Sequence, residues 1–156
     1  MAHGMLIAID PGLSGGIAAI DYEGNALWVT DLPHLEVNGH QVLDTAQVKR
    51  LTTKYTTVIL ERPYILPKQR GAATIYINYG RLTAAFKCWK EVAPATWKKG
   101  LGLGRQKEAS LRLAREHFPG MEDRLARKKD DGRAEALLIG LWYLRFRHNR
   151  YASTHT

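Results

Sequence analysis

The stretch that most constrains this chain lies near its N-terminus, where a short apolar run ends in one carboxylate and a glycine-rich turn follows. Residues 5–9 are apolar, Asp10 comes next, and Gly12, Gly15 and Gly16 mark the turn. A run this short, without polar alternation, predicts a strand buried on both faces of a sheet. A charge at the end of such a strand is costly unless it is paired. Asp10 therefore requires a metal ion, a basic partner or a turn that lifts it out of the core.

Turn residues and hydrophobic periodicity divide the rest of the chain into short elements. The expected elements are strands at 17–22 and 26–30, a polar loop at 33–40, a helix at 42–51, a strand at 58–61, a helix at 71–87, a strand at 91–93, a flexible basic glycine loop at 98–104, and helices at 107–118 and about 130–147. They predict one α/β domain over 1–156, with residues 1–4 as an expression remnant and 149–156 as a frayed tail.

The order of these elements predicts a five-stranded mixed sheet flanked by helices. The first three strands are joined by short loops and form an antiparallel meander. The strand at 58–61 follows a helix, so the usual crossover makes it parallel to the first strand. It also ends in a carboxylate, Glu61. Asp10 and Glu61 should therefore lie at one carboxyl edge of the sheet, where open α/β sheets bind their ligands.

Two further acids open the last helix. Asp131 and Glu135 are four residues apart and project from one helix face. Leu138 and Trp142 continue that face, so it should turn toward the sheet. The alternative is that Asp130 or Asp131 only caps the helix, because acidic side chains are favourable at a helix N-terminus.

The four acids predict a metal centre if they converge. Asp10, Glu61, Asp131 and Glu135 would repel one another without cations, and carboxylate oxygens favour Mg²⁺ or Mn²⁺. Two ions about 4 Å apart can bind a scissile phosphate and assist its hydrolysis. Asp10 alone is unspecific, since a glycine-rich turn after Asp also fits the phosphate loop of actin-like kinases and chaperone ATPases. Those folds need a duplicated domain, which 156 residues do not accommodate.

The positive charge of the chain is confined to its second part. Residues 1–61 carry 3 basic and 7 acidic side chains, whereas residues 62–156 carry 20 basic and 8 acidic ones. This asymmetry favours a polyanionic partner, most simply nucleic acid, and the alternative is a merely soluble basic surface. The single cysteine, Cys88, excludes an internal disulfide, and we expect it to be a buried apolar residue in a reducing, cytoplasmic setting without secretory signal or membrane span.

Three motifs in order resemble the RuvC family of Holliday junction resolvases, within the RNase H-like superfamily, and are most similar to its small phage-type members. They are Ile-Ala-Ile-Asp-Pro-Gly with Ser-Gly-Gly at 7–16, Ile-Leu-Glu-Arg-Pro-Tyr at 59–64, and Asp-Gly-Arg-Ala-Glu-Ala-Leu at 131–137. The segment 69–86 resembles the family's helix after the catalytic glutamate, and 92–118 resembles its basic segment. The resemblance thus extends over nearly the whole chain.

The resemblance implies a metal-dependent endonuclease that acts as a homodimer and nicks opposing strands of a four-way DNA junction, with two Mg²⁺ or Mn²⁺ ions per site and no nucleotide cofactor. It implies the metal ligands Asp10, Glu61, Asp131 and Glu135, and it makes Lys107 the best match for a lysine near the scissile phosphate. The family usually spaces its last two acids three apart and ends with Asp, whereas this chain has a spacing of four and Glu. Both spacings share one helix face.

Basic and aromatic residues around these motifs are the expected DNA contacts. Tyr64 follows the strand at 58–61 and could stack on bases at the junction centre, with ordinary loop packing as the alternative. The expected phosphate contacts are Lys98, Lys99, Arg105, Lys68 and Arg70. Trp97 could flank DNA, but we expect it, like Trp89, to be in the core.

Two alternatives stay open, one within the nucleases and one outside them. One is another RNase H-like nuclease that acts on branched DNA, a flap or an RNA–DNA hybrid. The other is a catalytically inactive protein that only binds junctions.

Overall fold

A computed structural model describes residues 4–55 and 57–148 of the chain. Its main sheet has five strands in the order β3-β2-β1-β6-β7. Their bounds are β1 Met5–Asp10, β2 Gly16–Asp21, β3 Ala26–Asp31, β6 Thr57–Glu61 and β7 Lys90–Val92. Strands β3, β2 and β1 are antiparallel neighbours, and β1, β6 and β7 are parallel. The predicted mixed sheet is therefore confirmed.

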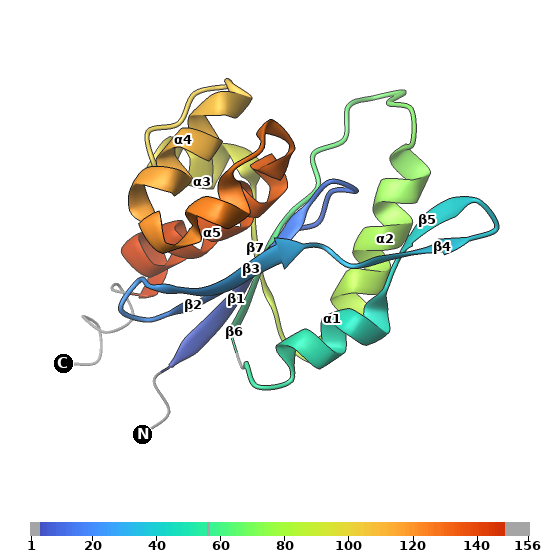
Figure 1. The fold of residues 1–156 in the computed structure, drawn as a ribbon. Helices are drawn as coiled ribbons and strands as arrows, with labels where there is room; N and C mark the ends of the chain where they lie inside the picture. The colour runs from blue at the N-terminus through green and yellow to red at the C-terminus, as the bar shows by residue number, and fades with distance from the viewer. Residues whose placement is uncertain (1–3, 56, 149–156) are drawn as a thin grey trace.

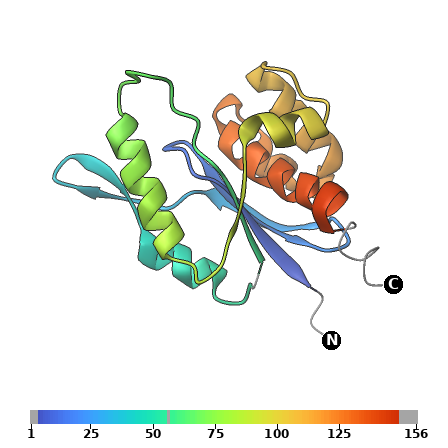
Figure 2. The same cartoon turned by 180° about the vertical axis from the view of Figure 1, so that it is seen from behind.

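Helices cover both faces of this sheet, as Figures 1 and 2 show. One face is covered by α1 (Thr45–Thr52) and α2 (Ala72–Ala84), and the other by α3 (Pro94–Gly100), α4 (Lys107–His117) and α5 (Asp131–Tyr143). Two short 3₁₀ segments, η1 (Pro119–Leu125) and η2 (Lys128–Asp130), precede α5, and a π-helical segment, η3 (Leu144–His148), follows it. One apolar core lies between the sheet and each of the two helical layers.

Helix α5 is the inner helix of its layer. Nearly all of its residues after Arg133 are buried, including Leu137, Leu138 and Trp142. A side chain at Gly140 would place its Cβ 2.4 Å from Cδ1 of Ile20 on β2, so the helix lies directly on the sheet at this point. This close packing fixes the start of α5 relative to the ends of β1 and β6.

Two predicted loops are instead regular structure. The expected polar loop at 33–40 is wrong, because β4 (His34–Val37) and β5 (His40–Leu43) form a hairpin that projects beside α2. Asn38 and Gly39 at its tip have positive φ angles of 51° and 76°, the backbone conformation that a tight two-residue hairpin turn requires. Because the hairpin extends to Leu43, α1 begins later in the sequence than expected, at Thr45 after the capping residue Asp44.

The basic glycine loop expected at 98–104 is wrong in its first part. Residues 98–100 belong to α3, which starts at Pro94, a residue whose fixed φ angle suits the first position of a helix. The chain leaves helical structure only after Gly100, so Trp97 and Lys98 occupy defined positions on a helix.

Several expected core positions are exposed. Ala73 and Ile77 are among the candidate core positions of the helix expected at 71–87, but both are exposed because α2 buries Asn78 and Leu82 on its inner face. Cys88 and Trp89 lie in the surface connection between α2 and β7, so the prediction that they are buried is also wrong. The predictions for residues 1–3 and 149–156 concern positions outside the described residues. Among the described helices, none has the length and apolar character needed to cross a membrane.

Candidate active site

Three of the predicted acids meet at the carboxyl edge of the sheet. Asp10 ends β1 and Glu61 ends β6, and the parallel register pairs Ile9 with Leu60 just before them. Glu135 comes from the second turn of α5. One carboxylate oxygen from each of these acids lies within 4.8 Å of the others, and all three side chains are partly buried.

Contact between two backbones brings α5 this close to the sheet. A Cβ atom on Gly132 would lie 2.0 Å from the carbonyl oxygen of Ser14, and one on Gly16 would lie 2.5 Å from the carbonyl oxygen of Gly132. The first turn of α5 therefore rests on the glycine turn that follows Asp10. Gly16 is required by this contact, whereas Gly15 is required by the turn itself, because its Cβ atom would lie 2.0 Å from the carbonyl oxygen of Asp10.

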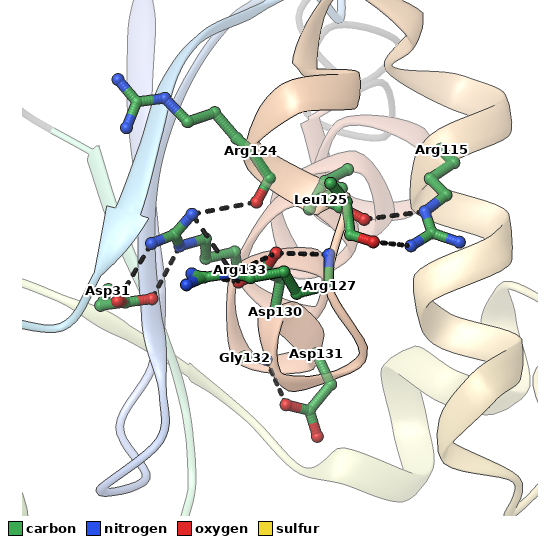
Figure 3. Close-up of polar contacts among 10 residues, drawn as sticks. Asp31, Arg115, Arg124, Leu125, Arg127, Asp130, Asp131, Gly132 and Arg133 are labelled. Carbon is green, nitrogen blue, oxygen red and sulfur yellow. Dashed lines mark hydrogen bonds and ion pairs between the residues drawn. The ribbon is translucent and has the colours of Figure 1, made fainter.

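Asp130 and Asp131 have different surroundings, which Figure 3 shows. Asp130 is 1% exposed, and its carboxylate accepts hydrogen bonds from the backbone and the guanidinium of Arg127, both at 2.8 Å. Burial alone would raise the pKa of Asp130, but the hydrogen bonds from Arg127 and the charges of Arg127 and Arg133 hold this pKa below its ordinary value. Asp130 is thus tied up in an ion pair, whereas Asp131 lines the cleft beside the three acids.

Arg133 anchors the first turn of α5 to the sheet (Figure 3). Its Nε and Nη2 donate to the two carboxylate oxygens of Asp31 at 2.7 and 3.0 Å, and Nη1 donates to the carbonyl of Arg124 at 3.0 Å. Asp31 ends β3, so this two-pronged contact joins the far strand of the meander to the helix that carries Asp131 and Glu135.

Helix α3 supplies two contacts to the acids. Trp97 is fully buried, as expected for a core residue, and its indole Nε1 donates to Oε2 of Glu61 at 2.5 Å. The Nζ of Lys98 lies 3.0 Å from Oε1 of Glu135. The sequence predicts Lys98 as a DNA contact and gives no sign of the Trp97 hydrogen bond, because no local pattern indicates which acceptor a buried indole will meet.

Burial and the repulsion between neighbouring carboxylates make Asp10 and Glu61 hard to ionise. Burial, and then the charge of Glu135, raise the pKa of Asp10 to about 7, against the hydrogen bond from the Gly12 backbone. Burial, and then the charge of Asp10, raise the pKa of Glu61 to about 8, although the hydrogen bond from Trp97 opposes the rise. A divalent cation would offset this repulsion, and three carboxylates are the hard oxygen donors that Mg²⁺ and Mn²⁺ favour. The residues present therefore fit such a cation.

The stability of the metal-free protein should fall as the pH rises. The pKa values of Asp10 and Glu61 are raised above their ordinary values of 3.8 and 4.5, so the folded state binds protons more tightly than the unfolded state. Their contribution is complete below these ordinary values and is lost as the pH rises through about 7 and 8. We expect the thermal midpoint in EDTA to drop by roughly 5 °C or more between pH 5 and pH 9.

Two comparisons check this pH dependence. Mg²⁺ should reduce the drop at high pH, because it binds the ionised form, and Asp10→Asn should flatten the profile in EDTA. A wild-type profile in EDTA that stays level or rises over this range would contradict the prediction.

The acids lie in an open cleft of about 500 Å³. Its wall includes three of the six predicted DNA contacts, Tyr64, Lys98 and Arg105. It also includes Lys107, the predicted lysine near the scissile phosphate. Tyr64 is 75% exposed, so it is not a packed loop residue. Lys68, Arg70 and Lys99 are exposed but do not line this cleft. The structure thus gathers the four predicted acids and part of the predicted basic and aromatic residues in one cleft, and their roles stay predictions.

The chain is similar to known proteins in part of its sequence and in its fold. No family model matches the chain. A segment of 50 residues, 31% of the chain, is 54% identical to the chloroplastic Holliday junction resolvase MOC1 of Chlamydomonas reinhardtii, of which it spans only 6%.

Solved structures match over nearly the whole chain. Thermus thermophilus RuvC in complex with a Holliday junction substrate superposes with a TM-score of 0.66 at 15% identity, covering 93% of this chain and 97% of that one. A second structure of Thermus thermophilus RuvC gives a TM-score of 0.65 at 16% identity, covering 90% and 95%. The chain therefore has a RuvC-like form of the RNase H-like fold, as its three motifs predicted.

Proposed function

We propose that this protein is a DNA endonuclease that resolves four-way junctions by nicking opposing strands, in the cytoplasm of a bacterial or phage-infected cell. The observation that carries the proposal is the meeting of Asp10, Glu61 and Glu135 at the carboxyl edge of a RuvC-like sheet, inside an open cleft with a basic wall. The names of the relatives support the substrate, since one is a Holliday junction resolvase and another was solved with a junction bound.

The acids would hold two Mg²⁺ or Mn²⁺ ions. Asp10, Glu61 and Glu135 provide the converging oxygens, and Asp131 adds a carboxylate at the cleft wall. When bound, such ions activate a water for in-line attack and stabilise the leaving 3′ oxygen. Because Lys98 pairs with Glu135 at 3.0 Å, its ammonium is placed to balance acid charge or to contact a phosphate in the cleft.

The remaining residues of the cleft would bind DNA. Arg105 and Lys107 are exposed on its wall and would contact backbone phosphates, which fixes the register of the duplex arm without reading sequence. Tyr64 presents an exposed ring beside the acids and would stack on a base that is unpaired at the centre of the junction.

A substrate panel tests this function. The panel contains a four-way junction, a linear duplex, a flap and an RNA–DNA hybrid of matched length, each incubated with Mg²⁺ or with EDTA. We expect paired nicks only in the four-way junction, and only in the presence of Mg²⁺. Junction binding without nicking would indicate an inactive binding protein, and preferred cleavage of the hybrid or flap would indicate another RNase H-like nuclease.

Symmetric nicking requires two sites, and we propose that α2 joins two copies of the chain. Its outer face is apolar and lacks a partner within the described chain, with Tyr76 61% and Ile77 55% exposed. The small residues Ala73, Gly80 and Ala84 are exposed on the same helix, which allows close approach of a second helix. A second copy of the chain, docked through the same face of its own α2, would cover this surface and would also supply the second acid cluster.

Ile77→Asp should therefore weaken the dimer by at least about tenfold, because it buries a charge at the centre of an apolar contact. Sedimentation analysis over a concentration series measures the dissociation constant of the dimer. Leu27→Asp is the matched control, since Leu27 is 42% exposed on β3 and should leave the dimer unchanged. Equal dimerisation of wild type and Ile77→Asp would exclude this face.

A further inference from the structure

Helix α3 packs against α5 and also contacts the acid cluster. A Cβ atom on Gly100 would lie 2.7 Å from the ring of Trp142, so the two helices are in close contact there. From this position α3 presents neighbouring residues to acids on two different elements. Trp97 donates to Glu61 on β6, and Lys98 pairs with Glu135 on α5.

The contact of Trp97 with Glu61 is not required by packing alone. A buried indole needs an acceptor for its single N–H, and backbone carbonyls commonly serve. Here the acceptor is one oxygen of a carboxylate in the acid cluster, at 2.5 Å. The ring also lies beneath the Lys98 ammonium, 5.2 Å from Nζ to the ring centroid. The edge of the Trp97 ring thus donates to the Glu61 carboxylate, and the face of the same ring lies against the ammonium group of Lys98.

We propose that Trp97 is a positioning residue for the metal site, whose indole N–H holds the Glu61 carboxylate in the orientation that receives the cation. Trp97 would not itself bind metal or DNA, because it is fully buried. An N–H that donates to Oε2 restricts rotation of the carboxylate about its last bond, and a carboxylate oxygen of Glu61 lies within 4.8 Å of oxygens of Asp10 and Glu135. The inference rests on the proposed metal site and goes beyond it by naming a residue that none of the three motifs contains.

The first test compares two tryptophan variants in metal binding. Trp97→Phe keeps an aromatic ring but removes the N–H, so the Mg²⁺ concentration at half-maximal thermal stabilisation should rise by about 10–100-fold. Trp28→Phe is the matched control, since it removes an indole N–H that donates to the Tyr55 hydroxyl at 3.0 Å, and Trp28 does not line the cleft. Its Mg²⁺ midpoint should equal that of the wild type.

The second test uses the wild-type protein, so it holds even if Trp97→Phe does not fold. The chain has 4 tryptophans, whose indole N–H groups give separate signals in a ¹⁵N–¹H spectrum. Phe variants of the other three assign the Trp97 signal by elimination. We expect this signal to shift on titration with Mg²⁺, while that of Trp28 stays in place.

The outcomes separate the inference from the function. If Mg²⁺ stabilises the wild type but the folded Trp97→Phe variant has the wild-type midpoint, or the Trp97 signal does not move, the positioning role is wrong while the metal site stands. If Mg²⁺ neither stabilises the wild type nor shifts any indole signal, the metal site is wrong and the inference falls with it. If both tests succeed but no junction is cut, the inference holds and the proposed reaction is wrong.

Discussion

Replacing Asp10 by asparagine should lower the cleavage rate of a four-way junction by about 10³-fold or more, while junction binding stays at or above the wild-type level. Asparagine has nearly the shape of aspartate, so the fold should be retained. It lacks the negative charge that the ions require, and a carboxylate oxygen of Asp10 lies within 4.8 Å of oxygens of Glu61 and Glu135. Binding is spared because one negative charge is removed beside the DNA phosphates.

Two measurements check this expectation. Single-turnover nicking in Mg²⁺ gives the rate, and a gel-shift titration in EDTA gives the affinity. Asp123→Asn is the matched control, since Asp123 is an exposed acid in η1 that does not line the cleft. If Asp10→Asn cuts at a wild-type rate, the acid cluster is not the catalytic centre.

A methyl group at Gly132 should have the second large effect. Gly132→Ala would raise helix propensity, which by itself is stabilising by up to about 1 kcal/mol. The available space reverses the sign, because the new Cβ would lie 2.0 Å from the carbonyl oxygen of Ser14. That neighbour is backbone and cannot rotate away, so α5 must move off the turn that follows Asp10. We expect a loss of about 1–3 kcal/mol in the free energy of unfolding.

The same displacement should damage the site more than the fold. Asp131 and Glu135 ride on α5, whereas Asp10 and Glu61 end strands of the sheet, so moving the helix separates the two pairs. A misplacement of about 1 Å commonly costs about 10²-fold in rate, and cleavage should fall by that factor or more. Gly120→Ala is the control, since among the described residues no atom other than those of its own chain neighbours lies within 4 Å of its added Cβ. Equal stability and cleavage in both variants would contradict the close contact.

The sheet and its two strand-end acids were predictable from local sequence patterns. The runs before Asp10 and Glu61 are apolar enough to specify buried strands, and the crossover rule alone makes those strands parallel. The hairpin at residues 34–43 was missed because its strands are short and mostly exposed, which makes their periodicity weak, although Asn38-Gly39 is a hairpin signal.

The acids of the last helix could be predicted only as a group. Asp130, Asp131 and Glu135 are all near the start of α5, and spacing does not say which of the two aspartates faces the sheet. The structure separates them because Arg127 and Arg133 surround Asp130 and leave Asp131 at the cleft. That outcome depends on where two arginines lie in space.

By itself, the sequence determined that Asp10 and Glu61 end neighbouring buried strands, since hydrophobic pattern and chain connectivity act locally and leave few topologies. Only the tertiary structure decided what surrounds them. The Trp97 hydrogen bond, the Lys98–Glu135 ion pair and the contact of Gly132 with Ser14 each join segments that are far apart in the chain. Their free energies depend on burial and on distances of a few ångströms, which no local pattern encodes.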